Sequence, residues 1–313
     1  MTGGTRRFCH IWVGVLLVLW SVTGGDSDAA EDTDAAGEAK PAKDKKPADE
    51  IDPPENKDDA LWELGVGGGG GWFPDYPASG QGHIRGLALP FVIYRGKQFQ
   101  AGERSLARGL FVDTDRFEFD VSFAGSLPAD SSDNDAREGL DDLDYLGEIG
   151  PRASYYFYRD RPGNQLRLDL QLRAVLSTDF SSFDYVGIVF NPQLVQEFVD
   201  VGAIKGLETR WGAGFRLADE GVMDLFYEVP VSGVTNERRR FDASAGYLGA
   251  NLYGSVSYDV TDRLTFALGA NVASYAGATN RDSDLFVDET NFSIGSAVVW
   301  TIWESEARSR ASW

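Results

Sequence analysis

The feature that most constrains the fold is an alternation of apolar and polar residues with a period of two, repeated in several stretches. In the clearest stretch, residues 164–178, leucine and alanine alternate with Arg167, Asp169, Gln171 and Arg173. Successive side chains of a strand point to opposite faces, so one face is apolar and the other charged. Strands of soluble sandwiches run only about 5–6 residues, whereas a strand that crosses a bilayer needs about 9–11. The pattern predicts an all-β, antiparallel transmembrane β-barrel with its polar side inward.

Residues 1–25 have the composition of a secretory signal peptide. Two arginines precede an apolar run at residues 11–22, and a threonine and two glycines follow it. The run is too short for a spanning helix, so we expect export, with a retained N-terminal anchor as the alternative. Because Cys9 precedes the apolar run, the exported chain would hold no cysteine for a disulfide or a thiolate metal site.

Charge and composition exclude several classes of protein. The net charge of −20 argues against nucleic acid as a partner and against simple adhesion to anionic lipid. No apolar run of helical-span length occurs after residue 25. The 36 glycines and the aromatic content of 12% suit a barrel, in which glycine relieves crowding and aromatic rings lie at the interfaces.

The chain divides into four parts. Residues 1–25 are the expected signal peptide, and residues 26–60 contain almost no large apolar residue, so we expect a disordered leader. This leader is interpreted as a periplasmic spacer, with a docking peptide as the alternative. Residues 61–303 form the predicted outer-membrane barrel, and residues 304–313 a short tail.

Alternation and turn residues place about twelve strands in the barrel. They are expected at 61–73, 84–94, 97–112, 115–125, 146–159, 164–178, 185–198, 206–217, 222–229, 246–260, 263–275 and 290–303. An even number puts both ends on the periplasmic side, but this count also puts the acidic loop 126–144 there, where connections are usually short. Either segment 222–229 is a loop or the acidic loop faces the periplasm, and ten strands is the alternative.

One segment carries a family resemblance. Residues 87–99 read LALPFVIYRGKQF, after an opening strand at 62–68 and before Arg108-Gly109-Leu110. With this block the chain resembles the MipA/OmpV family, the MltA-interacting proteins of the Gram-negative outer membrane. The proline within a strand and the Tyr-Arg-Gly turn after it make the block specific. The resemblance covers about residues 61–303, most strongly in the first fifth.

The resemblance implies a non-enzymatic outer-membrane scaffold, facing lipopolysaccharide, that links a murein-cleaving lytic transglycosylase to a penicillin-binding murein synthase in cell-wall turnover. Other members are described as adhesins or permeation channels, so a small diffusion channel or a surface adhesin is the alternative. The chain departs from the family in its longer, acidic leader and in residues after the last strand. Barrel-assembly machinery is expected to read an alternating terminal strand that ends in an aromatic residue. Arg308 and Arg310 interrupt the alternation before Trp313, so Trp303 is the better candidate for that residue.

Enzymatic chemistry has little support in the residues. After the signal peptide the only histidine is His83, with Ser79 close in sequence, and a Ser-His hydrolase is conceivable. A polar loop residue at the membrane surface is the better interpretation, because no G-x-S-x-G elbow and no histidine pair at metal spacing occur. We predict no catalytic residue, no cofactor and no metal site.

Three further features have structural interpretations. The acidic loops 130–135 and 141–144 lack the complete calcium loop and are expected to be solvated, with weak divalent binding that bridges to lipopolysaccharide phosphates as the alternative. The glycines at 67–71 lack a following Lys-Ser/Thr and are expected to allow curvature or close contact between strands. An interfacial girdle is expected from Trp72, Tyr76, Trp211, Tyr227, Tyr247, Tyr275, Trp300 and Trp303.

The predicted inward charges bear on whether the lumen is open. They comprise Arg167, Arg173, Arg210, Arg216, Glu118, Asp120, Asp169, Glu208, Glu228 and Asp259. Both signs occur in similar number, which favours pairing across strands and a filled lumen over a selectivity ring of one sign.

Overall fold

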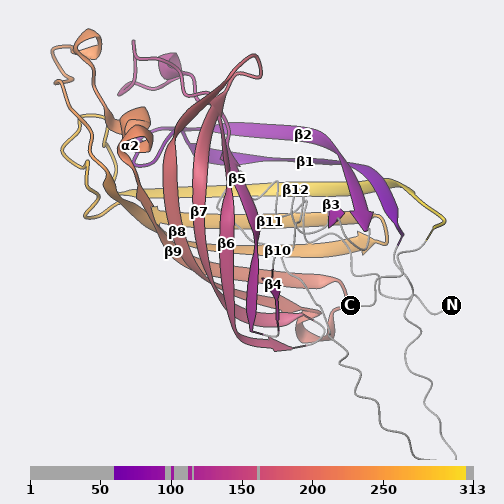
Figure 1. Cartoon of the computed structure of the whole chain (residues 1–313). Coiled ribbons are helices and arrows are strands. Elements are labelled where there is room, and N and C mark those ends of the chain that lie inside the picture. Colours follow the sequence, from indigo (N-terminus) through magenta and orange to yellow (C-terminus); the bar gives the residue numbers. More distant parts are fainter. Residues whose placement is uncertain (1–59, 96–99, 102–111, 115, 161–162, 308–313) are drawn as a thin grey trace, which may run out of the picture.

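A computed structural model of the chain describes residues 60–95, 100–101, 112–114, 116–160 and 163–307. The predicted signal peptide, the predicted leader and most of the tail lie outside these ranges. The described residues form one antiparallel sheet, strongly curved into a half-barrel, with one α-helix at one end of it (Figure 1). Within the described ranges, no helix is long and apolar enough to cross a membrane.

The strands have the lengths expected for a tilted crossing of a bilayer. Ten are long, from 10 residues in β5 to 17 in β8, and two have only two residues each. Their bounds are β1 Trp62–Pro74, β2 Gly82–Arg95, β3 Gln100–Ala101, β4 Val112–Asp113, β5 Phe117–Ser126, β6 Tyr145–Asp160, β7 Asn164–Thr178, β8 Phe183–Val199, β9 Leu207–Ala218, β10 Gly246–Thr261, β11 Leu264–Ser274 and β12 Thr290–Glu304. The helical elements are α2 Glu220–Tyr227 and the 3₁₀ turns η1 Ser131–Asp133, η2 Val201–Ala203 and η3 Val231–Gly233.

Strand order follows the sequence, with the first and last long strands side by side. The sheet runs β3-β2-β1-β12-β11-β10-β9-β8-β7-β6-β5-β4, and every neighbouring pair is antiparallel. Glu63 near the start of β1 is opposite Glu304 at the end of β12. The expected placement of both sheet termini at one end is therefore confirmed.

The apolar-out, polar-in alternation is confirmed on the strand that gave the clearest signal. On β7, Arg167 and Gln171 are completely buried, whereas Leu170 is 42% and Leu172 is 48% exposed. Strand β5 repeats the pattern: Glu118, Asp120 and Ser122 are buried, and the apolar residues that alternate with them are more exposed. Leucine is exposed and arginine buried, the reverse of a soluble protein, as a membrane-facing surface requires.

The predicted strand at 222–229 is wrong, because residues 220–227 form α2. The Asp219 carboxylate accepts a hydrogen bond from the backbone amide of Val222 and caps the helix N-terminus. The buried residues Val222, Met223, Phe226 and Tyr227 recur at helical spacing and give the helix one apolar face. Asp224 lies within this apolar run and gives it the apolar–polar alternation of a strand, which explains the error.

The predicted strand at 97–112 lies mostly outside the described residues, and its described ends belong to different strands. β3 pairs with β2 at one margin of the sheet, and β4 pairs with β5 at the other. Direction alternates between neighbouring strands, and β3 and β4 are the first and the twelfth strands of the sheet order, so they run in opposite directions. One continuous strand therefore cannot contain both.

This reversal decides the position of the acidic loop. Residues 127–144 lie between β5 and β6 at the end of the sheet that carries α2, opposite the end where β1 begins. Of the two alternatives for loop 126–144, the one in which segment 222–229 is not a strand is therefore confirmed, and the loop lies at the end opposite the sheet termini. The connections at the terminal end are short, for example 200–206 and 262–263, as periplasmic turns are in bacterial barrels.

The long connections pack together into a structure that we call the loop cap, made of residues 75–81, 127–144, 219–245 and 275–289. Its apolar core, which includes adjoining strand ends, consists of Tyr76, Ala78, Ala129, Leu143, Val175, Val189, Ala218, Val222, Met223, Phe226, Tyr227, Val229, Ala243, Leu248 and Leu285. Hydrogen bonds join the loops, since the Tyr76 hydroxyl donates to the Leu285 carbonyl at 2.7 Å and that of Tyr227 to the Pro77 carbonyl at 3.0 Å.

The loop cap also corrects the expected aromatic girdle. Tyr76 and Tyr227 are buried in the core of the cap, and Tyr275 packs against it, so these three tyrosines do not line the membrane interface. The tryptophans of the predicted girdle are exposed on the strands, as expected: Trp72, Trp211, Trp300 and Trp303.

The glycine run in β1 allows the close strand contact that was predicted. A β-carbon at Gly71 would collide with the backbone carbonyl of Ile294 on β12, and one at Gly65 with that of Trp300. The run therefore brings the first and last long strands together, and a phosphate loop is excluded because the residues lie within β1.

Candidate functional site

Charged side chains pair along the concave, polar face of the sheet. Arg167 Nε lies 3.1 Å from an oxygen of Asp169, and its Nη2 lies 3.2 Å from Glu197 Oε1. Arg210 reaches the same Glu197 oxygen at 2.5 Å. These pairs join β7, β8 and β9 and bear out the expected pairing of Arg167, Asp169 and Arg210.

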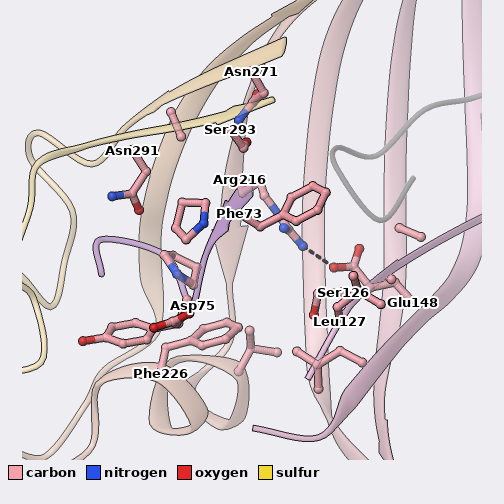
Figure 2. A pocket seen from close by; sticks show the side chains of 18 of the residues that line it. Phe73, Asp75, Ser126, Leu127, Glu148, Arg216, Phe226, Asn271, Asn291 and Ser293 are labelled. Carbon is pink, nitrogen blue, oxygen red and sulfur yellow. Dashed lines mark hydrogen bonds and ion pairs between the residues drawn. The ribbon is translucent and has the colours of Figure 1, made fainter. Parts of the chain in front are cut away.

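Nearer the loop cap, one carboxylate is shared by two arginines. Glu148 on β6 lies 3.3 Å from Arg173 Nη1 of β7, and its other oxygen accepts a hydrogen bond from Arg216 of β9. Two guanidinium groups against one carboxylate leave an excess positive charge. Figure 2 shows the Arg216–Glu148 pair at the wall of a cavity.

Several members of the network were missed or misplaced from sequence. Arg152 pairs with Asp120 and lies 3.8 Å from Glu118, but it was not among the predicted charges, and neither were Glu148 and Glu197. Glu148 and Arg152 share one face of β6 by their even spacing, which is the signal that could have found them.

One predicted inward acid lies elsewhere, and another lies on the inward face but far from the paired charges. Glu228 follows α2 as its C-cap residue, so it belongs to the loop cap. Asp259 lies near the terminal end of the sheet, where it accepts a hydrogen bond from the Thr265 hydroxyl at 2.6 Å.

Where β1 meets the loop cap, Asp75 is the centre of a hydrogen-bond cluster. Its side chain is 1% exposed, with Arg85 Nη2 at 2.5 Å and His83 Nδ1 at 2.8 Å. Asn134 of loop 127–144 donates to its other oxygen at 2.7 Å. Burial raises the pKa of Asp75, but the hydrogen bonds from Asn134, His83 and Arg85 outweigh burial and leave this pKa below its ordinary value.

The candidate hydrolase residues do not form a catalytic pair. The Ser79 hydroxyl donates to the Gln81 carbonyl at 2.8 Å and accepts from Asn134 at 3.0 Å. The described bond of His83 goes to Asp75 instead. His83 is 42% exposed, as expected for a polar residue at the lip of a strand.

The acidic loop residues stabilise local turns. Asp130 caps η1 by accepting from the Ser132 amide at 2.8 Å, and hydrogen bonds from Ser132 lower the pKa of Asp130. Asp142 accepts from the Ser131 amide at 2.7 Å. Among the residues with described positions, no group of three or more histidine, cysteine or acidic side chains is arranged to hold a metal ion.

A cavity of about 180 Å³ lies between the loop cap and the network of charged pairs (Figure 2). One part of its wall is polar: Asn271 of β11 and Ser293 of β12 are opposite each other in the strand register, close to Arg216. Another part is apolar, with Phe73 at the end of β1 and Phe226 of α2. The cavity is therefore both charged and apolar, the combination typical of sites for small organic molecules.

One comparison with known proteins identifies a family. A family model described as MltA-interacting protein MipA matches residues 66–302. The matched range extends from β1 to β12 and includes the whole loop cap. No curated protein matches the chain.

Proposed function

The chain belongs to the MltA-interacting protein MipA family, and we propose that it acts as a non-enzymatic outer-membrane scaffold for a lytic transglycosylase of the MltA type. A penicillin-binding murein synthase is the proposed second partner, so that the barrel would hold together an enzyme that cleaves murein and one that makes it. Family membership supports the transglycosylase as a partner, and the pairing of charges along the interior face favours binding over transport.

We place the sheet in the outer membrane as a closed, twelve-stranded barrel. β3 and β4 extend the two margins of the sheet and run in opposite directions, as two arms of a closing hairpin would. The apolar faces of the long strands point away from the concave side, which suits contact with lipid and lipopolysaccharide. Export by the N-terminal signal peptide is part of this proposal.

The observation that favours a scaffold over a diffusion channel is the pairing of charges across the interior. Arginines and carboxylates from β5 to β9 contact one another. The ring of Tyr253 lies against Gly212 of β9, and its hydroxyl donates to Gln193 Oε1 of β8 at 3.3 Å. The loop cap lies over one end, so a solute would have to displace paired charges as well as packed loops.

The proposed docking surface is the end of the sheet opposite the loop cap. It carries the short connections 200–206 and 262–263 and the point where the leader, residues 26–60, joins β1. With the loop cap facing outward, this end would face the periplasm, where murein enzymes act.

Affinity capture from detergent extracts of the native envelope tests the scaffold. The full-length protein should retain a lytic transglycosylase, and a variant without residues 26–60 should retain less of it if the leader contributes to docking. A variant with Glu237→Gln in the exposed part of the loop cap is the matched control and should capture as much as the wild type. Absence of both murein enzymes from the captured material would contradict the proposal.

A further inference from the structure

We propose that the cavity beneath the loop cap binds a small monocarboxylate with an apolar body. The inference is independent of the scaffold function, because it concerns the interior of the barrel and not its periplasmic end. It rests on the charge balance, the unused hydrogen-bond donors and the apolar wall of the cavity.

The charge balance around the cavity favours an anion. Glu148 lies between Arg173 and Arg216, so this triad carries one excess positive charge. The other charged pair at the cavity, Asp75 with Arg85, is balanced. Arg152 faces two carboxylates of β5, Asp120 and Glu118, so the excess positive charge is local to the Glu148 triad and does not extend to the whole interior. A ligand carboxylate would neutralise the excess charge beside Arg216.

Hydrogen-bond donors remain for that carboxylate. In the described structure, Nε of the cavity-lining Arg216 is buried without a hydrogen-bond partner. Asn271 uses its Oδ1 to accept from Asn251 at 3.1 Å, which leaves its amide hydrogens for another acceptor. Both carboxylates of the wall, in contrast, already accept from arginines. A buried guanidinium N–H without an acceptor is costly, and a bound carboxylate would relieve that cost.

The remaining wall fits a hydrocarbon. Phe73, Val175, Val222 and Phe226 line the cavity, and Figure 2 shows Phe226 across the cavity from Arg216 and Ser293. A volume of about 180 Å³ accommodates a molecule the size of benzoate. Benzoate has a carboxylate at one end and an apolar ring at the other, so it matches both parts of the wall and serves as the probe.

Isothermal titration calorimetry of the full chain in a non-ionic detergent tests the proposal. Benzoate should bind with a Kd of about 1 mM or below, as the size of the ligand allows. Benzamide, which has nearly the same shape and no charge, should bind at least about 10-fold more weakly, because it loses a charge-assisted hydrogen bond. Benzylamine, which carries a positive charge, should give no binding heat.

Variants locate the site. Arg216→Gln should weaken benzoate binding by about 10-fold or more, and Ser293→Ala should weaken it by a smaller factor. Arg210→Gln is the matched control, because Arg210 is an ion-paired arginine on the same strand but outside the cavity. Each variant is first checked for the heat-modifiable gel mobility of a folded barrel, and Ser293→Ala preserves the test should Arg216→Gln not fold.

Three results would overturn the proposal. They are equal affinity for benzoate and benzamide, wild-type affinity in both Arg216→Gln and Ser293→Ala, and no binding heat with benzoate at 10 times the expected Kd. Equal losses in Arg216→Gln and Arg210→Gln would assign the effect to the general charge of the interior and would equally reject the cavity as the site.

Discussion

Individual polar side chains in this protein are held by partners that come from distant parts of the chain. Asp75 contacts His83 and Arg85 on β2 but also Asn134 from the loop between β5 and β6. It thereby connects the β1–β2 hairpin to the loop cap. A buried carboxylate with several donors is stabilised as the anion, and removing its charge leaves the donors unsatisfied.

We therefore predict that Asp75→Asn destabilises the protein by about 3 kcal/mol, as expected for one broken partner of a buried ion pair. The measurement is urea unfolding in detergent micelles, followed by tryptophan fluorescence. Asp262→Asn, in an exposed turn at the opposite end, is the control and should change stability by less than about 0.5 kcal/mol.

The pH dependence of this difference has a defined sign. Because the pKa of Asp75 is lowered on folding, its stabilising contribution is fully present above the unfolded-state value of about 4 and is lost as the pH falls through the lowered folded value. The difference in the free energy of unfolding between wild type and Asp75→Asn should thus be constant at neutral pH and should narrow only in acid. A gap that widens on acidification would contradict the assignment.

At the scale of elements, the strands could be predicted from sequence where one face is uniformly polar. On β7 four polar side chains alternate with leucines, and no other periodicity fits. The helix α2 was not predicted, because Asp224 interrupts an apolar run and gives it the apolar–polar alternation of a strand. The signal that could have identified it is Asp219 followed by apolar pairs four residues apart, at 222–223 and 226–227. The Asp75 cluster and the cavity could not be predicted, because their residues come from segments far apart in the sequence; the cavity wall takes residues from β1 and from β12.

The N-cap of α2 gives a prediction for the loop cap. The Asp219 carboxylate accepts from the Val222 amide at 3.2 Å and from the Ile188 amide at 2.9 Å, so it joins the helix to β8. Asp219→Ala should cost about 1–2 kcal/mol. It should also speed the hydrogen exchange of amides in α2 more than of those in β7.

Asp219→Asn is the control for the capping bond alone, since an asparagine side chain keeps one acceptor for the helix amide and caps helices nearly as well but loses the second oxygen, which accepts from Ile188. The stability of this variant and the exchange rates of its α2 amides should be much closer to those of wild type than the values for Asp219→Ala. Equal exchange rates in α2 for wild type and Asp219→Ala would show that the cap does not hold the helix.

The whole molecule combines an apolar outer surface, a paired polar interior and a loop cap at one end. These features together motivate the proposed position in the outer membrane with the short connections toward the periplasm. We predict that the exported protein fractionates with outer-membrane vesicles and migrates faster on gels before heating than after it. Recovery in the soluble periplasmic fraction, with no change of mobility on heating, would refute the membrane assignment.

The central claim is that the interior is filled by paired charges and covered by the loop cap, so that the protein serves to bind partners and not to conduct solutes. Single-channel recording in planar bilayers tests this claim most directly. The ion pairs of Glu148, Asp169 and Glu197 with their arginines predict small conductance or none. Large, stable and ion-selective conductance steps would contradict the claim and would assign the protein to transport.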